Sequence, residues 1–252
     1  LYLIIRCAAR TSIALLLCML PLAGTHARAE GPTSPVRQSA AVQPLSVVAY
    51  YPMWAVCDLP PQRLDFKAFT HIIWFWGEPT NTYPYFSLTA GSSDSTTLTT
   101  GTPGWCLNPL DNGSNGLTHL KIMRDSCRVN GVKLLLCVGG EWGGPASTFA
   151  AMVADTVKQN AFIDAATGFA RRNGFDGIDI DWEFPDRAAN LRALYSRFLL
   201  RLRATLDSWP TRGILSAAYP TWFWWNPAHT EPIVEISVMN STHDLVDLMQ
   251  YG

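Results

Sequence analysis

The stretch Phe175-Asp-Gly-Ile-Asp-Ile-Asp-Trp-Glu-Phe-Pro185 decides the fold of this chain. Its acids Asp179, Asp181 and Glu183 stand two residues apart, and large apolar residues alternate with them. Successive side chains of a β-strand point to opposite faces, so a strand here carries three carboxyl groups on one face and apolar groups on the other. Burying unpaired carboxylates is costly, so an ordinary core strand does not carry such a series. The alternation therefore predicts a strand that lines a functional site.

Three other interpretations of this stretch are a solvated acidic face, a calcium loop and a charge ladder on an edge strand. A calcium loop of the EF type needs turn-forming residues and a glycine at its sixth position, whereas Ile178 and Ile180 favour a strand. A solvated edge does not explain why Trp182 and the two isoleucines share one apolar face. A strand at a functional site accounts for both faces.

The segment Asp176-Gly-Ile-Asp-Ile-Asp-Trp-Glu183 resembles the Asp-x-x-Asp-x-Asp-x-Glu signature of glycoside hydrolase family 18, the chitinase family. The resemblance implies an α/β fold, the (β/α)8 TIM barrel, with this segment as its fourth strand. It also implies that Glu183 protonates the glycosidic oxygen. In this family the N-acetyl oxygen of the substrate is the nucleophile. Asp181 would orient the acetamido group and share a proton with Asp179, while Asp176, out of phase with the other acids, is expected to be structural.

The spacing alone supports this division of roles. With a strand rise of about 3.3 Å per residue, the Cα atoms of Asp181 and Glu183 lie about 6.6 Å apart on one face. A neighbouring carboxylate raises the pKa of a carboxyl group and keeps it protonated near neutral pH. Glu183 is nearest the C-terminal end of the strand, the rim at which barrel enzymes place their chemistry.

Two further segments resemble the strands that line the site in this family. Val48-Ala-Tyr-Tyr51 resembles the first strand, which implies that Tyr50 lines the minus-one sugar site. Met249-Gln-Tyr251 resembles the Met-x-Tyr-Asp segment of the sixth strand, which implies that Tyr251 contacts the N-acetyl group and that Met249 lies beside the substrate. Gly252 stands where the family has aspartate.

Cys137-Val-Gly-Gly140 resembles the Ser-x-Gly-Gly segment of the third strand, with cysteine in place of serine. The glycine pair is expected to provide room for the backbone. Loss of the serine hydroxyl is expected to remove one hydrogen bond that could tune the inner aspartates.

Aromatic side chains suit the flat apolar faces of sugar rings. Trp76, where the family has an inward phenylalanine, and Trp142 are expected to bind substrate, although core positions are an alternative for any one tryptophan. The long stretch 78–117 is rich in Gly, Ser, Thr and Asn and is expected to form a loop beside the sugar cleft or an unstructured insertion. Its stacking candidates are Tyr83, Tyr85 and Trp105.

The pattern of strands and helices agrees with a barrel. Parallel βα units are expected because helical periodicity over 147–173 and 188–206 alternates with apolar runs. A Rossmann or flavodoxin-like sheet is the alternative, but no Gly-x-Gly-x-x-Gly turn follows a strand. Beside the motif, the expected strands are 46–51, 69–76, 132–138, 214–219 and 246–251. These are about six of the eight units of a barrel, so we expect a chain truncated at its C-terminus.

Residues 1–29 are expected to be a signal peptide, since Arg6 and Arg10 precede an apolar run and Ala27-Arg-Ala29 offers a cleavage site. Residues 30–44 are then a flexible lead-in and 45–252 the catalytic barrel. The apolar run is too short to span a bilayer, so a secreted protein without membrane attachment is expected. Cleavage removes three arginines and no acid, and the net charge of −1 becomes −4. This mild acidity argues against a nucleic-acid partner.

Four cysteines remain after cleavage, and they allow three pairings. Cys137 lies in an apolar run and is expected to be a buried thiol, so one disulfide among Cys57, Cys106 and Cys127 would fit export. No Cys or His cluster has zinc-ligand spacing, and no metal or cofactor is expected.

Together these features predict a monomeric, secreted hydrolase of β-1,4-linked N-acetylglucosamine. Its substrate would be a polysaccharide or oligosaccharide, chitin or its oligomers. The alternatives are an endo-β-N-acetylglucosaminidase acting on glycans or peptidoglycan, and a chitin-binding lectin that has lost catalysis. Such lectins usually lack the acid at the position of Glu183.

Overall fold

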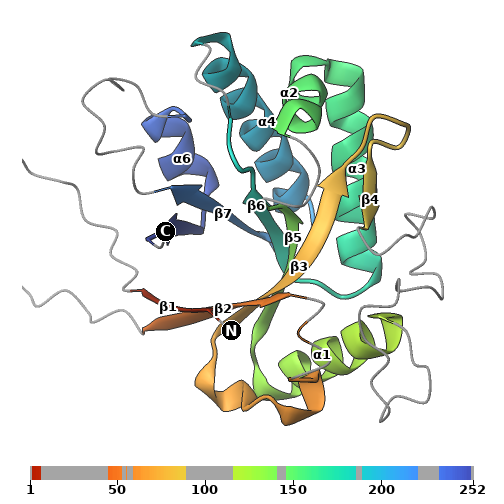
Figure 1. Cartoon of the computed structure of the whole chain (residues 1–252), viewed down its shortest axis with the longest axis vertical. Helices are drawn as coiled ribbons and strands as arrows, with labels where there is room; N and C mark the ends of the chain where they lie inside the picture. Colours follow the sequence, from red (N-terminus) through yellow and green to blue (C-terminus); the bar gives the residue numbers. More distant parts are fainter. Residues whose placement is uncertain are drawn as a thin grey trace, which may run out of the picture.

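A computed structural model of the chain describes residues 2–6, 45–52, 55, 59–88, 116–140, 146–185, 189–220 and 233–250. These residues form one curled sheet with helices on its outer side (Figure 1). The strands are β1 (Tyr2–Arg6), β2 (Ser46–Pro52), β3 (His71–Pro79), β4 (Phe86–Leu88), β5 (Lys133–Gly139), β6 (Gly177–Asp181), β7 (Ile214–Pro220) and β8 (Leu245–Met249). The helices are α1 (Gly116–Asn130), α2 (Ala146–Ala154), α3 (Thr156–Arg172), α4 (Ala189–Asp207) and α6 (Ile236–Thr242).

The sheet confirms the predicted TIM-barrel fold in partial form. Strands β2, β3, β5, β6, β7 and β8 pair in this order, and every pair is parallel. The six strands correspond to the six that the sequence predicts, and the sequence motif forms β6 in the middle of the series. In the described part of the chain they build a curled half-barrel, whose inner face carries the acids of the motif.

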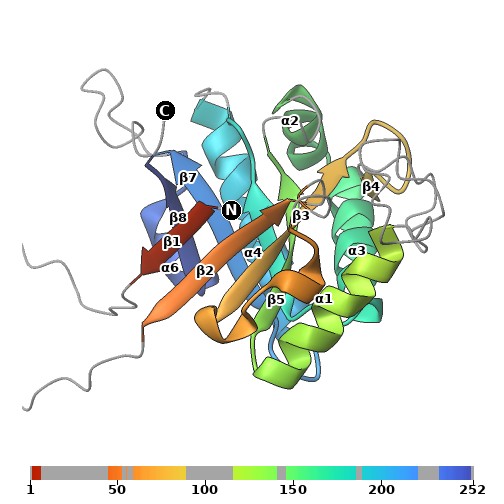
Figure 2. The same cartoon turned by 60° about the horizontal axis from the view of Figure 1, so that its bottom comes forward.

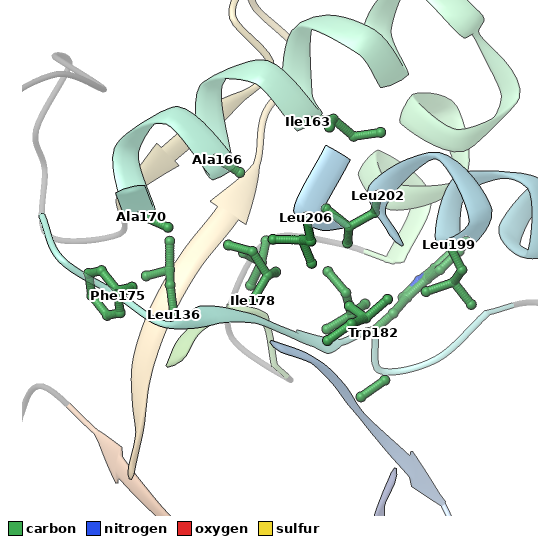
Figure 3. Packing of buried hydrophobic residues seen from close by; sticks show 14 of the residues in the cluster. Leu136, Ile163, Ala166, Ala170, Phe175, Ile178, Trp182, Leu199, Leu202 and Leu206 are labelled. Atoms are coloured by element: carbon green, nitrogen blue, oxygen red, sulfur yellow. The ribbon is translucent and has the colours of Figure 1, made fainter. Parts of the chain in front are cut away.

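The outer face of β6 anchors the hydrophobic core. Ile178, Ile180 and Trp182 are buried in one cluster with side chains of α3 and α4. Figure 3 shows Ile178 and Trp182 beside three leucines of α4. The Trp182 ring stacks on Phe149 of α2, with ring centroids 5.0 Å apart. Burial of a large apolar side chain contributes about 1.5–3 kcal/mol, so this face supplies the free energy that holds β6 in place.

The predicted helix over 147–173 is divided in two. Asp155 interrupts it with an extended backbone, and its carboxylate accepts hydrogen bonds from the backbone N–H groups of Val157 (2.8 Å) and Lys158 (3.2 Å). These are N-cap contacts, which satisfy donors at the start of a new helix. The apolar spacing continues through the break, so periodicity alone does not reveal it. The predicted stop at Gly174 is confirmed, since this glycine has a φ of 75°.

The predicted loop over 78–117 begins instead with a hairpin. Strand β3 runs on to Pro79, and β4 returns antiparallel to it. Phe86 of β4 packs edge-on against Phe162 of α3, with ring centroids 5.9 Å apart, and thereby fixes the hairpin on the outside of the barrel. At the turn, Tyr83 is 80% exposed. Trp105 lies outside the described residues.

A strand near the N-terminus covers the outer edge of the sheet. β1 pairs antiparallel with β2, with Leu3 opposite Ala49 and Ile5 opposite Val47 (Figure 2). This pairing satisfies backbone groups of β2 that would otherwise form an open edge. β1 belongs to the stretch predicted as a signal peptide, and that assignment stays a prediction.

The cysteines agree in part with the sequence analysis. Cys137 is a free buried thiol, as predicted. Cys127 is also free and buried, so a disulfide that includes it is ruled out. Its place on the apolar side of α1 explains this, and burial raises the pKa of its thiol to about 12. Cys57 and Cys106 lie outside the described residues. Among the residues described, no helix combines the length and the apolar character needed to cross a bilayer.

A buried arginine ties α4 to the N-terminal ends of β7 and β8. The guanidinium of Arg203, which is 5% exposed, donates to Asp207 (2.9 Å), to Asp244 (2.9 Å) and to the carbonyl oxygen of Gly213 (2.6 Å). Asp244 also accepts a hydrogen bond from the backbone N–H of Leu215 (2.9 Å). These bonds fix the start of the two strands that follow the motif.

We expect Arg203→Met to lower the free energy of unfolding by about 2 kcal/mol, because it leaves buried acceptors without their donor. Urea unfolding of the full-length protein measures this loss. The control is Arg201→Met on the same helix. Its guanidinium donates to Asn160 (2.9 Å) at the protein surface, so this substitution should cost less than about 0.5 kcal/mol. Equal losses in the two variants would contradict a special role for Arg203.

Candidate active site

The acids of the motif gather on the inner face of the half-barrel. Register places Cys137 of β5, Asp179 of β6 and Ser216 of β7 side by side across three strands. Asp181 lies two residues further along β6, opposite Gly139. Asp179 is fully buried and Asp181 is 6% exposed. The predicted alternation of β6 is therefore observed, with acids inward and apolar groups outward.

Two hydroxyl groups from distant strands hold Asp179. The phenol of Tyr50 on β2 donates to Oδ2 (3.0 Å), and the hydroxyl of Ser216 on β7 donates to Oδ1. Burial, followed by the charges of Asp179, Asp247 and Asp181, raises the pKa of Tyr50 well above its usual value. The phenol therefore stays protonated and can donate. Hydrogen bonds to both oxygens favour the charged form of Asp179.

Cys137 occupies the position at which the family signature has serine. Its side chain is fully buried opposite Asp179. Burial, and then the charges of Asp179 and Asp181, raise the pKa of this thiol well above its ordinary value, so it remains uncharged. Cys137 on β5 has no hydroxyl group that could donate to Asp179. Ser216 on β7 donates a hydrogen bond from its hydroxyl to the same carboxylate instead.

The surroundings of Asp181 favour its protonated form. Burial raises its pKa well above the ordinary value, and the charges of Asp179, Glu183 and Asp247 raise it further. Its Oδ1 is buried and has no hydrogen-bond partner in the part of the chain that is described. A protonated Asp181 can donate its O–H to a neighbouring acceptor, and a charged one can accept an N–H from a ligand.

Glu183 lies just beyond the end of β6 and is half-buried. Its neighbour Trp182 is held on the outer side by Phe149 and by the edge of Tyr195, whose ring centroid lies 5.1 Å away. This packing fixes the backbone from which Glu183 extends. The arrangement places a less buried carboxyl group two residues beyond a deeply buried one, which suits an acid that meets a ligand.

The glycine pair after β5 provides the predicted backbone room. Gly139 and Gly140 have φ values of 116° and 94°, which favour glycine. The N–H of Gly140 donates to the carbonyl oxygen of Asp181 (2.5 Å), and a Cβ on Gly139 would overlap this carbonyl group. The two glycines therefore allow β5 to approach the end of β6 closely.

The remaining predicted site residues are placed only in part. Met249 is 7% exposed and shares the inward phase of β8. Trp76 is an extra residue in β3, where the register against β5 shifts between Phe75 and Gly77. The side chain of Trp76 is not among the described parts of the structure. Trp142 and Tyr251 also lie outside the described residues. Their assignments stay predictions.

Sequence reasoning missed two polar residues of the inner face. Ser216 holds Asp179, and Asp247 of β8 is 1% exposed, with its charge acting on both Tyr50 and Asp181. The available signal was a polar residue in the middle of an otherwise apolar strand, at a phase that faces inward. No group of three or more His, Cys, Asp or Glu residues arranged for a metal ion occurs in the ranges described.

Comparisons with known proteins agree with this geometry. A probable endochitinase of Caenorhabditis elegans is 42% identical over 77 residues, which cover 31% of this chain and 12% of the relative. The class V chitinase CHIT5a of Medicago truncatula is 33% identical over 155 residues, covering 60% of this chain and 33% of the relative. The chain thus spans at most a third of the length of these two relatives.

A solved structure shares the fold. The family 18 chitinase of Cycas revoluta, crystallised with (GlcNAc)3, matches with a TM-score of 0.60 and 22% identity, over 81% of this chain and 54% of that one. The family model described as glycosyl hydrolases family 18 matches residues 46–252, which is most of the chain. The half-barrel, its acidic strand and this match show that the chain belongs to glycosyl hydrolases family 18.

Proposed function

We propose that the full-length protein hydrolyses β-1,4-linked N-acetylglucosamine, in chitin or chitooligosaccharides, with retention of configuration. The observation that carries this proposal is the pair Asp179 and Asp181 on β6, followed by Glu183 just beyond the strand, with Asp181 buried and its pKa raised. Relatives named as chitinases, and a solved neighbour bound to (GlcNAc)3, support the substrate class.

The proposed reaction begins when Glu183 gives its proton to the glycosidic oxygen. The acetamido oxygen of the minus-one sugar attacks the anomeric carbon, the bond from this carbon to the glycosidic oxygen breaks, and the remaining chain leaves as an alcohol. The intermediate is a cyclic oxazolinium ion. The Glu183 carboxylate then takes a proton from water as this water attacks the anomeric carbon, which reopens the ring and restores the acid.

Asp181 would stabilise the intermediate. As the acetamido oxygen attacks, the N–H of the acetamido group gains positive charge. A carboxylate that accepts a hydrogen bond from this N–H lowers the energy of the transition state. Asp181 must therefore lose its proton before this step, because its carboxylate form accepts the N–H more strongly than its neutral form. Asp179 can share the proton, since Tyr50 and Ser216 keep its carboxylate fixed beside Asp181.

Substrate contacts complete the proposal. Tyr50, Met249 and Tyr251 would line the minus-one site, and Trp76 and Trp142 would pack on the sugar faces. The protein would act as a monomer and need no cofactor.

The test of the general acid is Glu183→Gln in the full-length protein. This substitution removes the proton donor without changing the side-chain volume, so we expect kcat for release of a fluorophore from an aryl N-acetylchitobioside to fall at least about 100-fold. Glu235→Gln is the matched control, because Glu235 is exposed at the start of α6, and its activity should equal that of the wild type. A folded wild-type protein without turnover would favour a chitin-binding protein or a different glycan.

A second prediction concerns the hydroxyl of Ser216. Ser216→Ala takes a donor from the charged form of Asp179, so the proton affinity of the carboxyl pair rises. We expect the acidic limb of the kcat/KM profile to move to higher pH by about 0.5 to 1 unit. Ser196→Ala is the control, since this buried hydroxyl accepts the N–H of Glu235 far from the site, and it should leave the limb in place. An unmoved limb in both variants refutes the role of Ser216.

We also propose that the protein is secreted, from the basic start, apolar run and Ala27-Arg-Ala29 site of its first 29 residues. N-terminal sequencing of the protein recovered from the culture medium should begin at Glu30. Retention inside the cell with residues 1–29 intact would refute this.

A further inference from the structure

A fourth acid lies on the inner face, outside the motif. Asp247 stands in the middle of β8, in the run Leu245-Val-Asp-Leu-Met249, and is 1% exposed. Its neighbour in register on β7 is Ala218. Ala218 is in phase with Ser216, which points inward to Asp179. Asp247 therefore faces the same interior as the motif acids.

Asp247 and Asp181 lie at one level of the half-barrel. Ile180 is opposite Ala217, so the next residue of each strand places Asp181 opposite Ala218, and Ala218 is in turn opposite Asp247. Neighbouring strands lie about 4.8 Å apart, so the two aspartate backbones are about 10 Å apart. Only the methyl group of Ala218 stands between them on this face.

The electrostatics agree with the geometry. The charge of Asp247 raises the pKa of Asp181, together with the larger effect of burial and the charges of Asp179 and Glu183. It also raises the pKa of Tyr50, across the half-barrel on β2. Asp247 therefore acts on the members of the carboxyl cluster from the far side of β7.

In the part of the chain that is described, several acidic and neutral titratable groups share the interior with Asp247. Across β7 lie Asp181 and Asp179, with Glu183 at the mouth. Among the described residues, Tyr50 on β2 and Cys137 on β5 also face this part of the interior. Tyr195 and Tyr219, which are hydrogen-bonded to each other, lie on the outer side of the sheet, where burial and the charge of Asp179 raise the pKa of both phenols. His243 lies on that side as well, where it bonds to Tyr219 (3.0 Å).

Cations of the inner face are remote from this cluster. Lys133 and His71 pair in register at the opposite, N-terminal ends of β5 and β3. Lys133 is bonded there to Asp176 (2.9 Å). Among the described residues at the level of Asp181, the strands contribute no lysine or arginine. The described residues of these strands therefore place only Ala218 between Asp247 and Asp181 at this level.

We propose that Asp247 is a positioning residue of the active site, which acts through Asp181 and keeps a proton on the Asp179–Asp181 pair in the resting enzyme. The proposal rests on the hydrolytic function proposed above. Because a nearby negative charge makes the pair release this proton only at a higher pH, the protonation state in which the enzyme is active extends to a higher pH. Asp247 thereby sets the pH range of activity without touching the substrate.

The first test is Asp247→Asn in the full-length protein, which removes the charge and keeps the shape. Both limbs of the kcat/KM profile on an aryl N-acetylchitobioside should move to lower pH, by about one unit for a charge at this separation. The direction is opposite to that expected for Ser216→Ala. Asp244→Asn is the matched control, because this acid stands just before β8 and is paired with Arg203, and its loss should lower stability without moving the limbs.

The second test needs no turnover. Because the pKa of Asp181 is raised on folding, its contribution to stability is fully present below the unfolded pKa of about 3.9 and is lost as pH rises through the folded pKa. Urea unfolding between about pH 4 and pH 8 should show a smaller loss in Asp247→Asn than in the wild type, since the folded pKa is lower without the charge.

The outcomes separate the two proposals. If both limbs of the kcat/KM profile shift to lower pH and the loss of stability between about pH 4 and pH 8 is smaller, Asp247 is supported as a positioning residue. An altered stability profile in a folded protein that turns over no chitooligosaccharide supports the coupling of Asp247 to Asp181 and refutes the proposed hydrolysis. Limbs and stability profile equal to those of the wild type overturn the inference. If Asp247→Asn does not fold, Asp247→Ser, which is smaller and also uncharged, decides by the same two measurements.

Discussion

The burial of two carboxyl groups on one strand is the constraint on which this structure depends. Asp179 and Asp181 are withdrawn from water, and that is unfavourable unless the strand is held from its other side and the acids are supplied with hydrogen bonds or protons. The outer face of β6 meets the first condition, through Trp182 and two isoleucines packed beneath α3 and α4. The inner face meets the second in a different way for each acid.

Asp179 and Asp181 are adjacent in phase but have different environments. Asp179 receives hydroxyl groups on both oxygens, which favours its charged form. Asp181 has a buried oxygen without a donor among the described residues, and burial with neighbouring charges raises its pKa. One acid whose hydrogen bonds favour the charged form, beside another that tends to hold a proton, is the arrangement from which acid and base roles arise. Their coupled titration belongs to the group as a whole.

The elements around β6 serve this arrangement. Gly139 and Gly140 let β5 come close to the end of β6, and the Arg203 network fixes the beginnings of β7 and β8. These strands bring Ser216 and Asp247 to the inner face. The network is therefore part of what positions the site, although it lies at the opposite end of the strands.

The sequence by itself determined the strand, its two faces and the family resemblance, because a period of two is a local property that survives without knowledge of neighbours. It also indicated the parallel units, the end of a helix at Gly174 and the buried Cys137. It could not determine that Ser216 would replace a hydroxyl lost at Cys137, or that Tyr50 would reach Asp179 from 129 residues away. Register between strands decides such contacts.

The tertiary structure alone also decided the helix break at Asp155, the hairpin anchored by Phe86, and the place of Asp247 across Ala218. Each depends on which groups meet in space, whereas the local pattern is compatible with more than one outcome. A buried acid in an apolar strand can be recognised in the sequence as unusual. Which charges it faces follows only from the curvature and pairing of the sheet.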